Sequence, residues 1–394
     1  MTNIPLQDAL SGRISEKDVS FRTRMLEIAA DLPDVIALGR GDPDFHTPLH
    51  IAEAAKAAID ANKHHYTHPA GLLELRQAIA EKLRSENNLD YTADEVIVTC
   101  GCQEGIMLCM LALVDEGDEV LLPSPRFTSY DSAISMCGGV PVPVPTYERD
   151  DFALMPSEIE TRLTERSKVL VLVTPNNPTG AVTPPAVVRE IADLAERHNL
   201  IVISDEIYEK LIYEGSEHLS FGSLPGMKDR TITMNGFSKS YAMTGWRVGY
   251  LAAPASFMRM LIEPRHTLSI NASTPAQYAA LAALTGPQDA IREMNRAYAE
   301  RRTYLMEALD RMGLTYGHPG GAFYIYCNIS STGLPSPQFC ETLLVEAQVL
   351  IFPGTLFGDE HEDHIRIGYL QPLDRIKEAV GRMERVIAKY GVKA

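Results

Sequence analysis

The stretch from Gly236 to Tyr250 reads Gly-Phe-Ser-Lys-Ser-Tyr-Ala-Met-Thr-Gly-Trp-Arg-Val-Gly-Tyr. It places one lysine, Lys239, between two serines and among small and aromatic residues, and Arg247 follows. A lysine without a neighbouring carboxylate is suited to form a Schiff base, because desolvation favours the neutral, nucleophilic amine. Hydroxyls and a guanidinium nearby are suited to hold a phosphate. The stretch therefore predicts a site for pyridoxal 5'-phosphate (PLP), with an ordinary surface lysine as the alternative.

Short apolar runs on both sides of this stretch are predicted strands. Several consist almost entirely of β-branched residues and leucine, as in strands that are covered on both faces. Amphipathic helical stretches such as Gln103–Val114 and Pro184–His198 separate them. This alternation predicts an α/β fold with a mainly parallel seven-stranded sheet covered by helices. The predicted strands are Glu95–Thr99, Glu119–Leu122, Val140–Val144, Lys168–Val173, Leu200–Ser204, Thr231–Met234 and Val248–Ala252.

The pattern changes near residue 284, where a smaller α+β unit begins. The first forty or so residues contain one predicted helix, Glu16–Asp31, and no complete core. We therefore expect residues 46–284 to form a large PLP-binding domain, and residues 1–45 and 285–394 to form a discontinuous small domain. The elements predicted after residue 284 are helix Pro287–Met312, strand Ala322–Asn328, helix Pro337–Ala347, strands Val349–Phe352 and His364–Ile367, and helix Asp374–Tyr390.

Composition excludes several classes of protein. The net charge of −16 argues against a nucleic-acid partner and against binding to an anionic membrane surface. Six cysteines are too few for a disulfide scaffold, and neither a signal peptide nor a membrane-spanning run is present. We expect a cytoplasmic enzyme with reduced thiols. The spacing of Cys100 and Cys102 and the histidine clusters at 64–68 and 361–364 match no metal site, so we expect solvated histidines and no metal.

Two loops that follow predicted strands suit a cofactor. In Thr99-Cys-Gly-Cys-Gln-Glu, Gly101 permits a tight turn, and the next amides would face a phosphate at a helix N-terminus. Such turns are common, so this loop alone is a weak signal. In Thr174-Pro-Asn-Asn-Pro-Thr-Gly, the prolines and the glycine hold Asn177 rigidly enough to bind a ring oxygen. The alternative for the second loop is a plain turn.

Two further motifs place charged side chains next to apolar strands. In Ile203-Ser-Asp-Glu-Ile-Tyr, Asp205 would pair with a protonated pyridine nitrogen and Tyr208 would bind a ring oxygen. An N-cap is the alternative for Asp205. In His364-Ile-Arg-Ile-Gly-Tyr, Arg366 would bind a substrate carboxylate with both of its terminal nitrogens, or would form an internal salt bridge.

Together these motifs resemble the class I/II aminotransferases of PLP fold type I, and most closely the subgroup with bacterial aspartate and aromatic aminotransferases. The similarity runs nearly end to end. It implies an enzyme that moves an amino group between an L-amino acid and a 2-oxo acid by a ping-pong mechanism. The motifs that carry it are Leu38-Gly-Arg-Gly-Asp-Pro-Asp-Phe-His-Thr-Pro, Tyr66-Thr-His-Pro-Ala-Gly, Asn176-Asn-Pro-Thr-Gly, Ser204-Asp-Glu-Ile-Tyr, Ser238-Lys-Ser-Tyr-Ala-Met-Thr-Gly-Trp-Arg and Ile365-Arg-Ile-Gly.

The resemblance implies a role for each motif residue at the cofactor. Lys239 forms the Schiff base and then acts as general base and acid, while Asp205 pairs with the pyridine nitrogen. Asn177 and Tyr208 bind the ring oxygen. The residues implied to hold the phosphate, or in the last case to stack on the ring, are Gly101, Cys102, Gln103, Ser238, Arg247 and Phe127.

The resemblance also implies contacts with the substrate and with a second subunit. Arg366 binds the substrate α-carboxylate beside the backbone of Gly41, and Asn177 helps to fix it. Tyr66 matches a tyrosine that reaches the phosphate of the neighbouring subunit, so a homodimer with shared active sites is expected.

Two arginines depart from the pattern expected of the subgroup. Arg126 stands where an aromatic residue is common, and Arg40 precedes Gly41. Either could bind a distal carboxylate and so favour aspartate or glutamate, and the alternative for each is an ion pair. Phe21, Phe127 and Tyr130 could equally line an apolar pocket.

Two competing functions use the same fold. A carbon–sulfur β-lyase is expected to carry histidine beside the asparagine of the motif at 176–180, so Asn-Asn-Pro-Thr-Gly favours transamination. A non-catalytic PLP-fold sensor would need a basic DNA-binding segment and would be expected to lose Lys239 or Asp205, and both are present.

Overall fold

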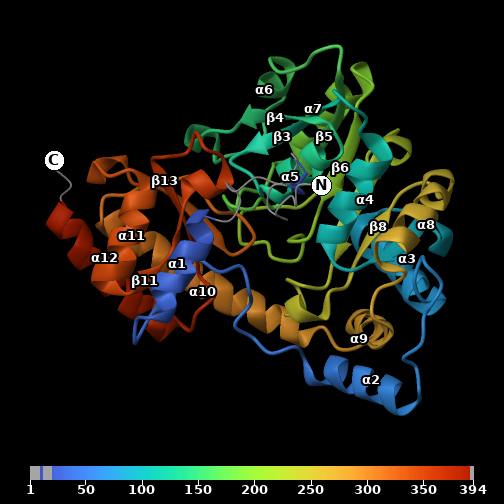
Figure 1. Ribbon diagram of the computed structural model, residues 1–394, viewed down its shortest axis with the longest axis horizontal. Helices are drawn as coiled ribbons and strands as arrows, with labels where there is room; N and C mark the ends of the chain where they lie inside the picture. Colours follow the sequence, from blue (N-terminus) through green and yellow to red (C-terminus); the bar gives the residue numbers. More distant parts are fainter. Residues whose placement is uncertain (1–8, 12–19, 391–394) are drawn as a thin grey trace, which may run out of the picture.

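The computed structural model describes residues 9–11 and 20–390 (Figure 1). Its largest sheet has seven strands in the order β2-β8-β7-β6-β5-β3-β4, and a second sheet has four strands in the order β12-β13-β10-β9. In Figure 1 the C-terminal elements, coloured orange and red, gather with the N-terminal helix α1 (Ser20–Ala30) on one side of the molecule. The helices and strands of the middle of the chain lie on the other side.

All seven strands predicted for the large sheet are confirmed. β8 runs antiparallel to both of its neighbours, and the other strands run parallel to one another, so the sheet is mainly parallel as expected. The strands are β2 (Val96–Thr99), β3 (Glu119–Ser124), β4 (Val140–Pro145), β5 (Ser167–Val173), β6 (Ile201–Asp205), β7 (Thr231–Gly236) and β8 (Gly249–Ala252).

Helices cover both faces of this sheet, which explains the continuous apolar runs. Val169 and Ile203 pack in one cluster with helices α4 (Cys102–Leu113), α5 (Ser129–Met136) and α8 (Ala255–Ser269). Their neighbours in the chain, Leu170 and Val202, point to the opposite face and pack with α7 (Pro185–Arg197). Successive strand residues alternate between faces, so a strand buried on both sides needs apolar residues throughout.

The C-terminal unit is built on the four-stranded antiparallel sheet. Its helices and the strands β10 and β13 agree with the predicted ones within a few residues, whereas β9 was not predicted. The predicted helix Glu16–Asp31 is seen as α1, and its residues 16–19 lie outside the described residues. The domain boundaries at residues 45/46 and 284/285 stay predictions. The elements are α10 (Asp289–Arg311), β9 (Thr315–Tyr316), β10 (Tyr324–Asn328), α11 (Ser336–Ala347), β12 (Phe352–Pro353), β13 (His364–Gly368) and α12 (Leu373–Tyr390).

The prediction of one strand over Val349–Phe352 is wrong. The chain forms β11 (Val349–Leu350), which pairs in parallel with β1 (Ile36–Ala37), and then β12, which pairs with β13. The apolar run is therefore shared between two sheets because the N-terminal segment supplies a second partner. Three helices outside the predicted set, α2 (Leu49–Asp60), α3 (Leu73–Asn87) and α9 (Thr274–Thr285), pack together, with α2 and α3 both against α9.

Within the described ranges, no helix combines the length and the apolar character needed to cross a bilayer. All six cysteines are free thiols.

Candidate active site

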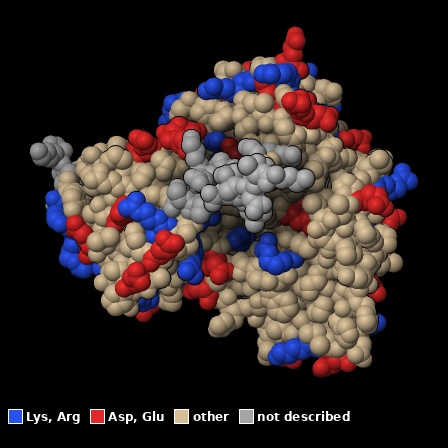
Figure 2. Space-filling model, viewed as in Figure 1, with Lys and Arg blue, Asp and Glu red and all other residues tan. Residues whose placement is uncertain are grey.

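A cavity of about 670 Å³ lies at the carboxyl ends of the parallel strands. Figure 2 shows a hollow near the middle of the face seen in Figure 1, with basic side chains in it. Ligands of parallel sheets bind at this edge, because the loops that follow the strands meet there. The cavity brings together most of the predicted site residues, namely Arg40, Gly41, Cys102, Gln103, Phe127, Asn177, Asp205, Tyr208, Ser238, Lys239, Arg247 and Arg366.

Lys239 follows β7 and extends its amine across the cavity floor. Its Nζ donates a hydrogen bond to the carbonyl oxygen of Gly41 at 2.6 Å and lies 5.6 Å from the centre of the Phe323 ring. No acidic side chain of the described residues forms an ion pair with it. A Cβ at position 41 would collide with the Tyr324 hydroxyl, so glycine is required for this approach. The amine is thus held by one carbonyl and one ring and is free to react.

Asp205 is the last residue of β6 and is only 6% exposed. It accepts hydrogen bonds from the Tyr130 hydroxyl at 2.9 Å and from the backbone N–H of Ile207 at 3.3 Å. Burial raises the pKa of Asp205 to about 6, although these hydrogen bonds oppose the shift. No helix begins at this residue, so it is not an N-cap. A buried carboxylate without a cationic partner is suited to a positively charged ligand group.

An anion-binding cup lies at the other end of the cavity. Gly101 has φ +77° and directly precedes α4, whose first amides face the cavity edge. Because β8 is antiparallel, its first residues come to the same edge and bring Arg247 with them. A Cβ on Gly101 would lie only 2.8 Å from Nη2 of Arg247, so backbone and guanidinium are in direct contact. Helix amides, Ser238 and Arg247 together suit a phosphate.

Arg366 lies on β13 and is 5% exposed. Its Nη1 donates to Oδ1 of Asn177 at 2.8 Å and its Nη2 donates to the carbonyl of Gly39 at 2.6 Å. Its buried Nε has no partner, and no carboxylate of residues 20–390 pairs with it. The internal salt bridge considered as an alternative is therefore not found. Burial lowers the pKa of Arg366, and the positive charge of Arg22 lowers it further.

The structure does not bring Arg126 into the cavity. Its guanidinium forms an ion pair with Asp131 at 2.8 Å and a longer one with Glu360 at 3.3 Å. The expectation that Arg126 binds a distal carboxylate is corrected, because its charge is already neutralised by these two acids. Phe21 and Tyr130 also lie off the cavity wall: Phe21 packs on the main core, and Tyr130 lies beneath Asp205.

Tyr66 lies apart from this cavity within one chain. Its side chain is 79% exposed and lines a separate hollow that also includes His65, His68 and Arg76. An exposed tyrosine at this place is available to a second subunit.

Several residues of the cavity were not predicted as site residues, among them Arg22 and Tyr324. Arg22 on α1 and Tyr324 at the start of β10 both line it. Tyr324 fell inside a predicted strand, and nothing in that strand pattern marks which tyrosine faces the cavity. Arg22 stands in an ordinary amphipathic helix, so no local signal identifies it.

A buried polar cluster lies next to Asp205. Ligand atoms of Glu206, Glu209 and His218 lie within 4.8 Å of one another. Lys82 forms an ion pair with Glu209, and Nε2 of His218 lies 3.2 Å from Glu206. Burial alone raises the pKa of Glu209, but Lys82 and its other neighbours outweigh burial and lower the pKa to about 2. These contacts balance the charges internally, so we assign no metal to the cluster.

The histidines at 361 and 364 are not solvated as expected. His364 is 9% exposed and stacks on Tyr326 at 4.8 Å, with 8° between the rings. Nε2 of His361 lies 2.9 Å from the Ser124 hydroxyl, and burial lowers the pKa of His361 to about 4. Both rings are therefore part of the packing between the large sheet and the C-terminal unit.

Comparison with known proteins agrees with this geometry. Residues 33–383 match the sequence model of "Aminotransferase class I and II". The chain is 44% identical to an aspartate aminotransferase of Pyrococcus abyssi, over 96% of this chain and 98% of the relative. It is 42% identical to aromatic-amino-acid aminotransferase 2 of Thermococcus litoralis, again over 96% and 98%.

The fold agrees with solved structures as well. The aspartate aminotransferase of Thermus thermophilus with maleate superposes with a TM-score of 0.90 at 38% identity, covering 96% of this chain and 99% of that one. The match spans both sheets and every motif that lines the cavity. The chain therefore belongs to the class I and II aminotransferases.

Proposed function

We propose that this aminotransferase holds PLP in the cavity and moves an amino group between an L-amino acid and a 2-oxo acid. The observation that carries the proposal is the set of three buried or half-buried charges in one cavity. Lys239, Asp205 and Arg366 each lack an ion-pair partner among the described residues. Unpaired charges in a cavity are costly unless a ligand neutralises them.

The residues present fit PLP at each end. Asp205, whose pKa burial raises to about 6, suits the pyridine nitrogen, and Lys239 suits the aldehyde. The cup at Gly101 and Arg247 suits the phosphate, because the lack of a side chain at position 101 lets the Arg247 guanidinium lie against the start of α4. We assign Asn177 and Tyr208 to the ring oxygen. Ser238, Cys102, Gln103 and Phe127 line the same cavity, where the first three would join the phosphate contacts and Phe127 would stack on the ring.

When bound, PLP supplies an aldehyde and a ring that withdraws electrons. The chain positions the reacting groups. Arg366 holds the substrate α-carboxylate, and Asn177 fixes the guanidinium from the side. The Nζ of Lys239 takes the proton from the substrate Cα and later returns a proton, as a general base and acid. Asp205 keeps a negative charge next to the ring nitrogen.

The excess of basic side chains in the cavity supports a dicarboxylic substrate. Among the described residues, the lining includes five basic side chains, Arg22, Arg40, Lys239, Arg247 and Arg366, and two acidic ones, Asp42 and Asp205. Lys239, Arg247 and Asp205 are assigned to the cofactor, and Arg366 is assigned to the α-carboxylate. Arg22 and Arg40 are left without ion pairs in the part of the chain that the structure describes. In a chain of net charge −16, this local excess suits a second carboxylate, as in aspartate or glutamate.

Replacing Arg22 or Arg40 with alanine is expected to raise the KM for aspartate and 2-oxoglutarate about tenfold or more, because a charge-assisted hydrogen bond is lost. The KM for alanine and pyruvate, which have no distal carboxylate, should change by less than about twofold. A panel of amino donors and oxo acids measures both effects.

Arg24→Ala is the matched control, because Arg24 lies on the same helix but pairs with Glu341 on the surface. It should leave every KM unchanged. Equal losses for dicarboxylic and uncharged substrates in the Arg22 and Arg40 variants would contradict the assignment.

The experiment that tests the proposed function is a half-reaction. Purified protein loaded with PLP is expected to be yellow, and its visible band should shift when an amino donor alone is added. A 2-oxo acid added next should restore the band, as a ping-pong mechanism requires. Pyruvate formed from cystathionine without any added oxo acid would indicate a β-lyase instead. A protein that binds PLP but shows no spectral change with any of twenty donors would contradict transamination.

Two further assignments complete the proposal. The exposure of Tyr66 supports a homodimer in which this side chain reaches the phosphate of the partner subunit. We place the enzyme in the cytoplasm, since six free thiols suit a reducing compartment.

A further inference from the structure

We propose that Tyr324 is a positioning residue with two separable functions: its ring orients Arg366, and its hydroxyl supports Tyr208. This inference rests on the proposed function, because it assigns the two target residues to the substrate carboxylate and to the cofactor. Tyr324 begins β10, is 1% exposed and lines the cavity.

The ring of Tyr324 forms part of an aromatic bed for the Arg366 guanidinium. The Cζ atom of Arg366 lies over the Tyr324 ring at 4.2 Å from its centre and over the Phe357 ring at 4.5 Å. Ring faces attract a cation without neutralising it, whereas a carboxylate would. The guanidinium is therefore fixed in place and remains available for the substrate carboxylate.

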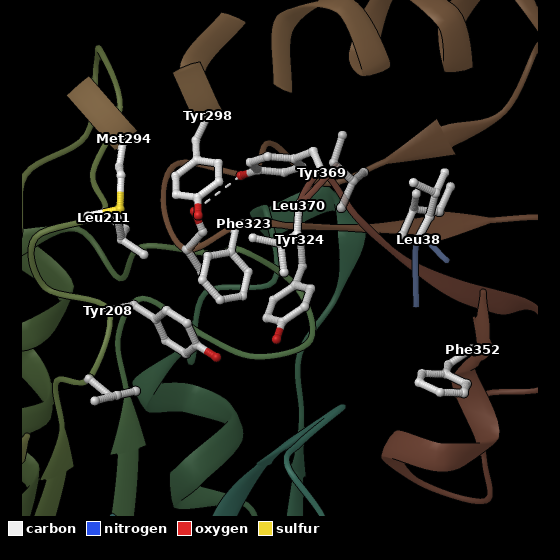
Figure 3. Close-up of a cluster of buried hydrophobic side chains, with 14 of the residues drawn as sticks. Leu38, Tyr208, Leu211, Met294, Tyr298, Phe323, Tyr324, Phe352, Tyr369 and Leu370 are labelled. Carbon is white, nitrogen blue, oxygen red and sulfur yellow. Dashed lines mark hydrogen bonds between the residues drawn. The ribbon is translucent and has the colours of Figure 1, made fainter. Parts of the chain in front are cut away.

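The hydroxyl of Tyr324 lies on the side of its ring that faces Tyr208 (Figure 3). Tyr208 and Tyr324 lie next to each other with their hydroxyls on the same side (Figure 3), and their ring centres are 6.2 Å apart. Burial, the proximity of Tyr324 and a hydrogen bond that the Tyr208 hydroxyl donates to Tyr324 raise the pKa of Tyr208 well above its ordinary value. The Tyr324 hydroxyl also lies against Gly41, whose carbonyl holds the Lys239 amine.

These contacts make Tyr324 the link between two parts of the site. Once the Tyr208 hydroxyl donates to a ligand instead of to Tyr324, the Tyr324 hydroxyl can donate to Tyr208, and this strengthens the bond that Tyr208 donates, because hydrogen bonds in a chain polarise one another. If Tyr208 donates to the ring oxygen of PLP, removing the Tyr324 hydroxyl weakens that bond and leaves more negative charge on the oxygen. The proton on the Schiff-base nitrogen of Lys239 would then be held more tightly, so it would be lost at a higher pH.

Tyr324→Phe removes the hydroxyl and keeps the ring. The pH midpoint of the visible absorbance change of the PLP-loaded protein is expected to rise by about half a unit. The inhibition constant of succinate, an acid without an amine, should stay within about twofold of wild type. Phe357→Leu removes the other ring, and it should weaken succinate binding about fivefold and leave the absorbance midpoint unchanged.

Tyr326→Phe is the matched control. Tyr326 lies two residues along the same strand and on the same strand face, but it stacks on His364 outside the cavity, and its hydroxyl has no partner among the described residues. Neither readout should move in this variant. Tyr324→Leu, which loses both ring and hydroxyl, should move both readouts. If it does not fold, Tyr324→Phe and Phe357→Leu carry the test.

An unchanged absorbance midpoint in Tyr324→Phe, or unchanged succinate binding in Phe357→Leu, would overturn the inference. The failure of the proposed function looks different. In that case the wild-type protein itself would take up no PLP or would show no half-reaction. If only this inference fails, the wild-type enzyme is active, and the variants have the same absorbance midpoint and the same succinate binding as wild type.

Discussion

Lys239→Ala is expected to abolish transamination and to leave the fold intact. The amine lies 2.6 Å from the carbonyl of Gly41 and forms no ion pair with the described residues, so its loss removes a reacting group and no structural contact of large energy. Among the residues that the structure describes, no other lysine lines the cavity to replace it. A lost nucleophile and proton carrier should lower kcat by roughly 10⁴-fold or more. Steady-state turnover measures the loss, and the thermal midpoint of the cofactor-free protein should stay close to wild type.

Two controls separate the chemistry of Lys239 from its charge. Lys239→Arg keeps a positive charge but cannot form a Schiff base, so it should be as inactive as the alanine variant. Lys210→Ala removes a lysine that pairs with Glu86 away from the cavity and should keep full activity. Borohydride reduction of the PLP-loaded wild type, followed by peptide mapping, should label Lys239. A label on another lysine, or turnover retained in Lys239→Ala, would contradict the assignment.

The large sheet was predictable because both of its faces are covered. A strand such as β5 needs apolar residues on both faces, since Val169 packs on one side and Leu170 on the other. That requirement leaves an uninterrupted apolar run in the sequence. The run at Val349–Phe352 has the same appearance, but it is divided between two sheets because β1, more than three hundred residues earlier, pairs with its first half. Such a division depends on a distant partner and leaves no local trace.

The site residues also include some that the local sequence reveals and some that it does not. Lys239, Asp205 and Arg366 stand in short motifs where a charge interrupts apolar sequence, and this contrast is visible locally. Tyr130 contacts Asp205 and Arg22 contacts the Phe352 ring, both far along the chain, so the sequence around each one looks ordinary. For Arg126 the local sequence suggests a role in substrate binding, and the structure contradicts it. Arg126 departs from the family pattern, but the acids that neutralise it, Asp131 and Glu360, include one from the distant C-terminal unit.

Asp205→Asn is expected to have opposite effects on catalysis and on the stability of the cofactor-free protein. Without a negative charge beside the ring nitrogen, the developing charge of the reaction is stabilised less, and kcat should fall by roughly 10³-fold. Asp42→Asn is the matched control, because Asp42 is a second acid that lines the cavity and its carboxylate accepts a hydrogen bond from Thr244. It should lower kcat far less.

The stability effect follows from the pKa of Asp205, which burial raises from 3.8 to about 6. The folded protein then binds this proton more tightly than the unfolded chain does. The contribution of Asp205 to stability is therefore most favourable below about pH 4, falls as the pH rises from 4 through 6, and stays low above that. Asparagine carries no charge, so the cofactor-free variant should be more stable than wild type at pH 8 by about 2 to 3 kcal/mol and by less at pH 5.

With PLP bound, the wild type should be more stable than Asp205→Asn, the reverse of the order without PLP. A cationic ring nitrogen compensates the buried carboxylate of the wild type, whereas asparagine offers it no charge. PLP should thus raise the thermal midpoint of the wild type more than that of Asp205→Asn, and denaturant unfolding with and without PLP measures the difference. If PLP stabilises both proteins equally, or if the cofactor-free variant is the less stable one at pH 8, Asp205 is not the partner of the ring nitrogen. Its burial would then reflect only the hydrogen bond from Tyr130.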